Sequence, residues 1–226
     1  TEMHGLYTAN EHITYDQHVV LPGLINAHTH TPMNLFRGFA DDLPLKEWLN
    51  KHIWPAESAI IDEHSTRVGT MLAIAEMLKG GITCFNDQYP FCEVSAQAAH
   101  ASGIRASIGI GIMNVNNQWA TDDQDCLRKA RHILTQPHSS RIQWTLAPHA
   151  PYTVSQVALE EIHALSTESS LKIHMHVQET AHEVSSFFQQ HGMSPTAYLH
   201  KLNLLSEKFI AVHCCHLSNE DIDLLA

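Results

Sequence analysis

The sequence has few basic residues and no cluster of positive charge. Its 226 residues include 13 Lys and Arg against 24 Asp and Glu, which gives a formal net charge of −11 at pH 7. A protein that binds a nucleic-acid backbone needs clustered Lys and Arg to neutralise the phosphates. The composition therefore argues against nucleic acid as a partner.

The sequence also lacks several patterns that define other classes of protein. No run approaches the roughly 18 apolar residues of a membrane span, so we expect no membrane partner. Neither GxGxxG nor GxxxxGK[ST] occurs, which leaves a phosphate-binding loop without support. The five cysteines show no CxxC spacing. We interpret them as reduced thiols of a cytoplasmic protein, not as a disulfide framework or a thiolate zinc site.

Histidine, by contrast, is abundant, with 19 in the chain. Two of these residues, His28 and His30, close a short apolar stretch that begins at Leu24. Residues two apart on a strand point to the same side. A strand here would deliver both imidazoles together to a metal ion such as zinc.

Strand-like and helix-like segments alternate along the chain. The predicted strands, besides the one that ends at His30, are residues 81–86, 104–110, 142–147, 172–177 and 209–214. The predicted helices are residues 62–79, 93–102, 122–134, 153–165, 184–191 and 194–202. Apolar residues at helical spacing mark the first helix, and Thr153 with Gln156 forms a capping box for the fourth. This alternation predicts parallel βαβ units, in a barrel or a doubly wound sheet.

Polar residues follow the carboxyl ends of the predicted strands. A (β/α)₈ barrel places its active site at these ends, whereas a doubly wound sheet concentrates it at one switch point. Six strands cannot close an eight-stranded barrel, so we expect the sequence to be a piece of a longer protein. The polar residues at strand ends are Asn86, Asp87, His149, His176 with Glu179, and His213.

Two histidine pairs in this set call for a choice. His174 and His176 share one face of a strand, and spacing alone does not decide between them, although we favour His174 as a hydrogen-bonded core residue. Glu179 follows closely enough to move protons beside a metal site. His213 and His216 flank two cysteines, but vicinal side chains on a strand point to opposite faces. We therefore expect His213 alone to reach the pocket.

Three further residues have competing interpretations. His149 lies between two prolines, which stiffen the loop and suit a residue that must keep one direction. Glu57 falls in a predicted loop, where on its own it is most simply a solvated carboxylate at a helix start. Asp87 could be a metal ligand or a helix cap, and we favour the cap.

Six stretches of the chain carry a resemblance to a known family. They are PGLINAHTHTPM at 22–33, HIWPAE at 52–57, GGITCFND at 80–87, APHAPYTVS at 147–155, HMHVQET at 174–180 and AVHCCHL at 211–217. From about residue 19 to residue 226, the sequence resembles the amidohydrolase superfamily in its cytosine/adenosine deaminase branch. Within that branch it is similar to the 5-methylthioadenosine/S-adenosylhomocysteine deaminases.

The resemblance implies a TIM (β/α)₈ barrel of the metal-dependent hydrolase type, here with about six βα units. Residues 1–20 would be the end of an N-terminal β-sandwich segment, and 21–226 the incomplete barrel. One Zn²⁺ ion is implied, although three imidazoles also suit Fe²⁺ or Ni²⁺. The implied fourth ligand, an aspartate on strand eight, would lie beyond residue 226. The implied ligands within the chain are His28, His30 and His176.

The resemblance also implies roles for four other residues. Glu179 would be the proton shuttle and would contact the substrate ring nitrogen. His213 would hydrogen-bond the attacking water or the tetrahedral centre. Glu57 and His149 would hold the substrate, with Glu57 on the ribose hydroxyls.

The implied reaction is hydrolytic deamination of the adenine ring in 5′-thio-substituted adenosines such as methylthioadenosine and S-adenosylhomocysteine, with release of ammonia and the inosine analogue. One alternative is a guanine-type or s-triazine amidohydrolase or chlorohydrolase with the same metal site. Glu57 argues against it, because a ribose-binding carboxylate has no purpose on a substrate without ribose. A zinc-binding but inactive interaction subunit is the second alternative. The sequence leaves open the 5′ substituent and whether the protein is a homo-oligomer.

Overall fold

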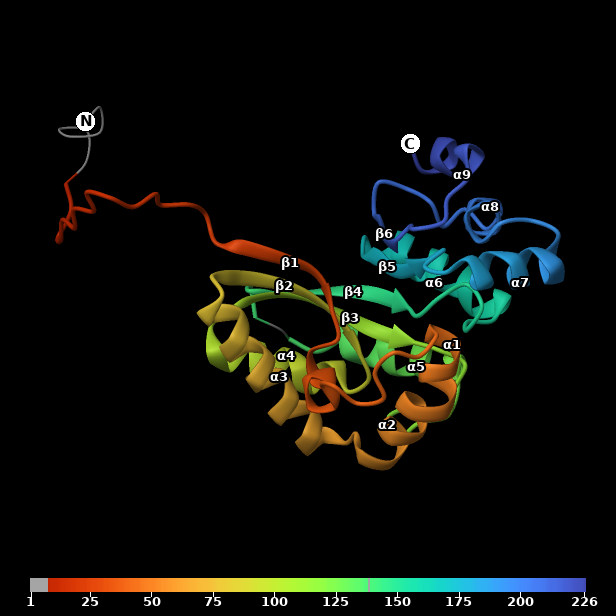
Figure 1. The fold of residues 1–226 in the computed structure, drawn as a ribbon, viewed down its shortest axis with the longest axis horizontal. Helices are drawn as coiled ribbons and strands as arrows, with labels where there is room; N and C mark the ends of the chain where they lie inside the picture. Colours follow the sequence, from red (N-terminus) through yellow and green to blue (C-terminus); the bar gives the residue numbers. More distant parts are fainter. Residues whose placement is uncertain (1–7, 138) are drawn as a thin grey trace.

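A computed structural model describes residues 8–137 and 139–226, and its centre is a curved sheet of six parallel strands (Figure 1). The strands lie in sequence order, each hydrogen-bonded to the next, with β1 and β6 at the two edges. This is the arrangement of six successive βα units of a (β/α)₈ barrel, as the sequence predicts. The strands are β1 (Leu24–Thr29), β2 (Ile82–Tyr89), β3 (Arg105–Ile112), β4 (Ile142–Pro148), β5 (Lys172–Val177) and β6 (Phe209–His213).

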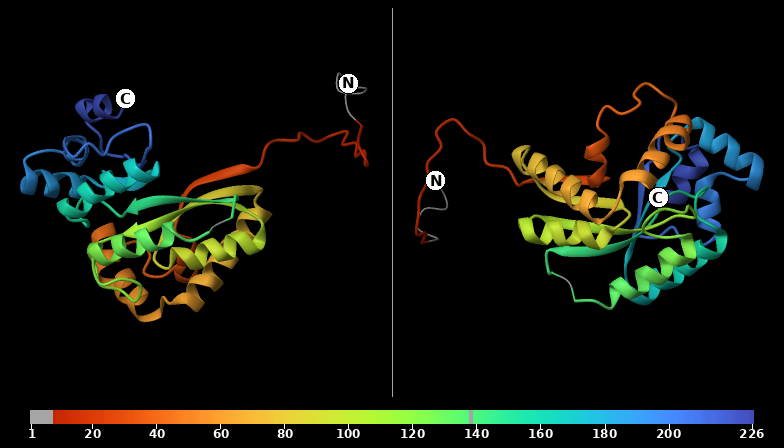
Figure 2. Two further views of the ribbon diagram at one scale, coloured as in Figure 1. Left: turned by 180° about the vertical axis from the view of Figure 1, so that it is seen from behind. Right: turned by 90° about the horizontal axis from the view of Figure 1, so that it is seen from below.

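Helices connect successive strands and lie outside the curved sheet (Figures 1 and 2). The long connection from β1 to β2 also carries four short elements before its main helix. They are η1 (Thr31–Phe36), α1 (Leu45–Trp48), η2 (Leu49–Ile53) and α2 (Trp54–Ile60). The remaining helices are α3 (Glu63–Lys79), α4 (Cys92–Ser102), α5 (Asp123–Leu134), α6 (Gln156–Ser169), α7 (Ala181–His191), α8 (Pro195–Lys201) and α9 (Asn219–Leu225).

The start of α6 differs from the prediction. Ser155 caps this helix by accepting a hydrogen bond from the backbone N–H of Ala158, so the predicted capping box at Thr153 and Gln156 is wrong. The Thr153 hydroxyl is instead engaged with the imidazole of His149 at 2.9 Å and with the backbone of Ala150. The Thr153 hydroxyl could bond either of two groups, and tertiary contacts determine which partner it takes. Sequence spacing carries no information on those contacts.

Helix α3 shows that one apolar stripe can predict a helix without predicting its buried face. The five residues whose spacing indicates this helix are exposed, and the buried face is made mostly of smaller side chains. Gly69 on that face lies so close to Pro32 that a Cβ atom would come within 2.8 Å of the proline backbone. The buried face therefore selects small residues for close approach to η1. The exposed stripe is Val68, Met71, Leu72, Ala75 and Leu78.

The N-terminal residues 8–23 contain no helix or strand and run away from the body of the molecule (Figure 1). Residues 1–7 of the predicted β-sandwich segment lie outside the described residues, and the assignment of 1–20 to a sandwich stays a prediction. No helix among the described residues has the length and hydropathy to cross a membrane.

Candidate active site

Three histidines meet where β1 and β5 end. His28 lies in β1, His30 follows it directly, and His176 lies in β5. One ring nitrogen from each comes within 4.8 Å of the others, and Nε2 of His28 is 3.2 Å from Nε2 of His176. Within the described part of the chain, this is the one group of at least three His, Cys, Asp or Glu residues with the geometry of a metal site. The structure groups His176, not His174, with the β1 pair.

Backbone carbonyl groups fix the orientation of two of these rings. His30 Nδ1 lies 2.5 Å from the carbonyl oxygen of Gln88, and His176 Nδ1 lies 2.7 Å from that of His149. A carbonyl oxygen can only accept, so both Nδ1 atoms carry hydrogen and donate. Each Nε2 atom therefore keeps its lone pair and points it into the site.

The third ring is oriented by another histidine. His28 Nδ1 lies 3.0 Å from Nε2 of His174, which is fully buried in β5. If His28 donates here, its Nε2 lone pair also faces the site, and His174 must carry its own hydrogen on Nδ1. That Nδ1 atom is buried, with no hydrogen-bond partner among the described residues. His174 is thus a hydrogen-bonded core histidine, in agreement with the favoured interpretation of the sequence.

Burial keeps these imidazoles neutral. It lowers the pKa of His28 to about 3, helped by the neighbouring histidines, and the pKa of His174 to about 4. The pKa values of His30 and His176 are also lowered, with burial as the largest cause. Neutral imidazole is the form that binds a metal ion.

The donor set fits a zinc ion. Two unprotonated nitrogens that face each other at 3.2 Å, as in His28 and His176, repel unless a cation lies between them. Zn–N distances of about 2.0–2.1 Å in a tetrahedral site place two nitrogens about 3.3 Å apart. The observed separation matches this value.

Glu179 and His213 lie beside the three histidines. Glu179 Oε2 is 3.6 Å from His213 Nε2, and both side chains remain about 30% exposed. The His213 ring stacks on His176 with a centroid distance of 5.3 Å. Glu183 accepts hydrogen bonds from the backbone N–H groups of Gln178 and Glu179, which holds the turn after β5. A carboxylate and an imidazole therefore flank the metal site with access to the cavity.

His149 has two structural roles in the turn after β4. Its carbonyl oxygen accepts from both the Nδ1 and the backbone N–H of His176. Its own Nδ1 is fixed by the Thr153 hydroxyl. Burial lowers the pKa of His149 to about 3, so the ring is neutral, and His149 lines the cavity.

Glu57 lines the same cavity from helix α2, so the predicted loop at this position is wrong. Sequence reasoning missed the helix because Trp54 and Pro55 form its first turn, where proline is tolerated. The Glu57 carboxylate accepts a hydrogen bond of 2.5 Å from the hydroxyl of Tyr89. Burial raises the pKa of Glu57 to about 7, against the opposing effect of this hydrogen bond.

Strand β2 runs beyond its predicted end, to Tyr89, so Asn86 and Asp87 lie inside it. Asp87 is buried and accepts hydrogen bonds from the backbone N–H and the hydroxyl of Thr31, at 2.8 and 2.6 Å. Asp87 does not cap the helix that follows it in sequence, because the N-cap residue of α4 is Phe91; it instead holds the start of η1 from another strand. The Asn86 amide donates to the backbone of Ala27. Both side chains tie β2 to the β1 end.

One cavity of about 600 Å³ joins the histidines to Glu57. This volume lies in the range of small-molecule sites, which is about 300–1,000 Å³. Large apolar and aromatic side chains supply much of the wall between the two ends. These include Met33, Trp48, Trp54, Phe91 and Trp119.

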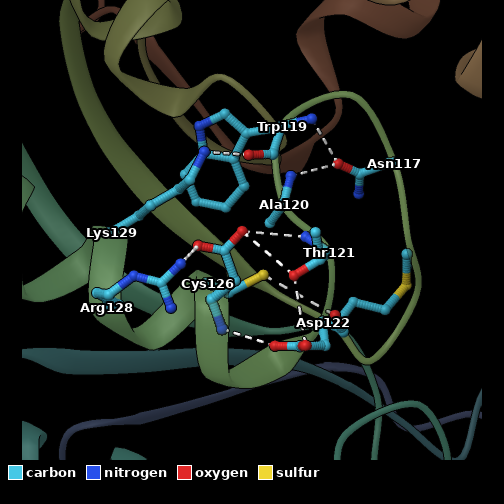
Figure 3. A network of polar contacts seen from close by, with 10 residues as sticks. Asn117, Trp119, Ala120, Thr121, Asp122, Cys126, Arg128 and Lys129 are labelled. Atoms are coloured by element: carbon cyan, nitrogen blue, oxygen red, sulfur yellow. Dashed lines mark hydrogen bonds and ion pairs between the residues drawn. The ribbon is translucent and has the colours of Figure 1, made fainter.

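Residues of the loop between β3 and α5 line the cavity, and sequence reasoning did not identify them. Figure 3 shows the polar contacts that hold this loop. Asn117 Oδ1 accepts from the backbone N–H groups of Trp119 and Ala120. Lys129 donates to the carbonyl oxygen of Trp119 and lies over its ring. Gln118 reaches across to the carbonyl oxygen of Ser58 in α2 at 2.9 Å. The loop is therefore held internally and tied to the helix that carries Glu57.

The fold and the grouped histidines are those of a barrel protein with a candidate metal site, and the chain belongs to the amidohydrolase family, whose model matches residues 19–226. A relative from Methanothermobacter thermautotrophicus, 5′-deoxyadenosine deaminase, is 41% identical over 92% of this chain and 49% of its own length. Another, 5-methylthioadenosine/S-adenosylhomocysteine deaminase from Saccharophagus degradans, is 43% identical over 95% of this chain and 48% of its own length. The chain spans about half the length of these curated relatives.

Solved structures show the same fold. A zinc-bound adenosine deaminase from Xanthomonas campestris superposes with a TM-score of 0.86 and 43% identity, over 90% of this chain and 46% of that one. Atrazine chlorohydrolase from Arthrobacter aurescens, with zinc, has a TM-score of 0.82 at 19% identity, over 91% of this chain and 51% of that one. The second likeness concerns the fold alone.

Proposed function

We propose that this chain carries the metal site and much of the substrate pocket of a zinc-dependent deaminase. The substrates are adenosines with a 5′ substituent, such as methylthioadenosine and S-adenosylhomocysteine, and the products are ammonia and the inosine analogue. The single observation that carries the proposal is one cavity lined by the three neutral histidines, Glu179 and the half-buried Glu57. Relatives named as deaminases of such adenosines support it.

In this proposal His28, His30 and His176 hold the zinc ion through their Nε2 atoms. A bound zinc ion supplies a water nucleophile whose pKa is lowered towards 7. The orientation of His30 and His176 by backbone carbonyl groups supports this role, because such partners fix the tautomer of a ligand.

Glu179 would protonate the purine nitrogen beside the attacked carbon and later assist the departure of ammonia. His213, 3.6 Å away, would stabilise the tetrahedral centre with a fixed hydrogen bond. Both groups have the access that a proton donor to a bound ring needs.

Glu57 and His149 would hold the substrate. A carboxylate accepts hydrogen bonds from hydroxyl groups, and a ribose offers two adjacent ones. Aromatic residues between Glu57 and the histidines, such as Trp54, would pack against the base and sugar. This end of the cavity favours a nucleoside over a free base or an s-triazine.

The partner of the protein is then a small nucleoside, and a homo-oligomeric state stays a prediction. All five cysteines are free. Free thiols support a location in a reducing compartment such as the cytoplasm.

The direct test is ammonia release from the zinc-loaded protein at its full natural length. Methylthioadenosine, S-adenosylhomocysteine, 5′-deoxyadenosine, guanine and an aminotriazine are compared side by side. We expect turnover of the 5′-substituted adenosines. Release only from guanine or the triazine would keep the metal chemistry but reject the substrate, and no release from any compound would favour an inactive subunit.

A further inference from the structure

Tyr89 is a buried polar residue of the cavity to which the proposed chemistry gives no role. It ends β2, is 5% exposed, and donates its hydroxyl hydrogen to Oε1 of Glu57. Among the described residues, the Glu57 carboxylate receives no other hydrogen bond and forms no ion pair. One neutral hydroxyl group is therefore the only direct polar partner that these residues give to a half-buried acid.

The position of Tyr89 links the two ends of the cavity. Its neighbour Gln88 provides the carbonyl oxygen that orients His30, and the rings of Tyr89 and His30 are 6.4 Å apart. Tyr89 itself is fixed by the strand, since β2 is hydrogen-bonded to β3 up to this residue. Glu57, in contrast, lies in α2, the last part of a continuous helical segment, 45–60, within a long connection. The hydrogen bond thus ties a helix-borne acid to a strand of the barrel.

We propose that Tyr89 is a positioning residue that holds Glu57 through Oε1 and leaves Oε2 to accept a hydrogen bond from a ribose hydroxyl. The pocket then selects nucleosides over free purine bases through this pair. This inference rests on the proposed function, because it assigns the part of the substrate that Glu57 contacts. Oε2 is the carboxylate oxygen without a partner in the described part of the chain, and Glu57 lines the cavity.

The charge state of Glu57 follows from the same contact. Burial raises its pKa to about 7, and the Tyr89 hydroxyl lowers it by stabilising the carboxylate. Among the titratable groups around the pair, Asp87 on β2 acts on Tyr89, the ring of His30 lies 6.4 Å from that of Tyr89, and the ring of His149 lies 6.4 Å from that of Trp54 in α2. No Lys or Arg among residues 8–137 and 139–226 contributes to the shift. Removing the hydroxyl raises the Glu57 pKa further, so less carboxylate remains at pH 7.

The experiment compares Tyr89→Phe with Tyr198→Phe in the zinc-loaded, full-length protein, with 5′-deoxyadenosine as the substrate. Tyr198 is a matched control, because it is 8% exposed, its hydroxyl lies 3.4 Å from Gln156, and it does not line the cavity. For Tyr89→Phe we expect KM to rise about tenfold, as for loss of a hydrogen bond to a charged group. We expect kcat, zinc content and the inhibition constant for free adenine to stay close to the unmodified values. Tyr198→Phe should change none of these.

The pH profile separates positioning from a structural role. Nucleoside affinity falls as pH drops through the Glu57 pKa, and in Tyr89→Phe this fall should begin at a higher pH. An unchanged KM and pH profile, or a loss confined to kcat, would overturn the proposal. If no adenosine is deaminated, the proposed function fails. Carbon-13 NMR of the Glu57 carboxyl group, assigned with Glu57→Gln, then tests the interaction between Tyr89 and Glu57 without an activity assay. A titration midpoint that does not rise in Tyr89→Phe would then reject it.

Discussion

The two ends of the cavity are built in different ways. The metal end consists of residues at the ends of parallel strands, His28 and His30 at β1 and His176 at β5, with backbone carbonyl groups behind two of the three rings. The Glu57 end consists of helix α2 and a loop: Tyr89 joins the helix to strand β2, and Gln118 joins the loop to the helix. A strand end is fixed by the sheet, whereas a helix in a long connection is fixed only by what it touches.

This difference in construction assigns rigidity to the metal end of the cavity and substrate selectivity to the Glu57 end. Sites on regular elements hold groups more firmly than sites on connections, which suits metal ligation. Connections vary more freely and carry specificity. Changes at the metal end should therefore abolish metal binding or chemistry, and changes at the Glu57 end should alter substrate affinity alone.

Removal of a metal ligand should have the largest effect. In His176→Ala the zinc site loses one of three imidazoles, so zinc content and ammonia release should disappear together. Metal analysis of the purified variant measures the first and a deamination assay the second. His132→Ala, at an exposed position of α5, is the matched control and should keep both. Stoichiometric zinc in His176→Ala would contradict the assignment.

Loss of the proposed proton shuttle, Glu179, should have the second largest effect. Glu179→Gln keeps the shape of the side chain but cannot carry a proton, so kcat should fall by about 10²–10⁴. Zinc content should not change. Glu168→Gln, at an exposed position of α6, should behave as the unmodified protein. Near-normal turnover of Glu179→Gln would show that another group moves the proton.

The hydrogen bond between His28 and His174 should contribute to zinc affinity. Partners of ligating histidines typically change metal affinity by about 10–100-fold when removed. In His174→Phe, His28 loses its acceptor at 3.0 Å, so competition with a chelator should show a weaker zinc site. His174→Gln can still accept through its amide oxygen and should retain more affinity. Equal affinities for both variants would contradict this role.

The smallest effect on chemistry should come from the opposite end of the cavity. Glu57→Gln should raise KM for nucleosides by about 10–100-fold, as for a hydrogen bond to a charged group, while kcat and zinc content stay unchanged. Nucleoside affinity of the unmodified protein should be highest above about pH 7, where the Glu57 carboxylate is ionised, and should fall below it. In Glu57→Gln this dependence should vanish. A fall in kcat as large as the rise in KM would contradict the assignment of Glu57 to substrate affinity alone.

Local signals in the sequence predicted most of the fold, because the alternation of apolar runs with helical spacing depends on neighbours along the chain. All six strands and the main helices form close to their expected bounds. The errors occur where two structures compete for one side chain. Thr153 bonds His149 instead of capping α6, and Asp87 caps η1 from a neighbouring strand. Such choices depend on partners distant in sequence.

The sequence alone determined the residue types that chemistry needs and their order on the strand ends, since a period of two places His28 and His30 on one side. It placed His176, Glu179 and His213 at or just beyond predicted strand ends, without deciding by spacing between His174 and His176. The tertiary structure decided which of His174 and His176 faces the β1 pair, because the curvature of the sheet sets that distance. It also brought Glu57 to Tyr89, 32 residues along the chain. That contact exists because a helix from one connection folds over the end of a strand, which no local pattern encodes.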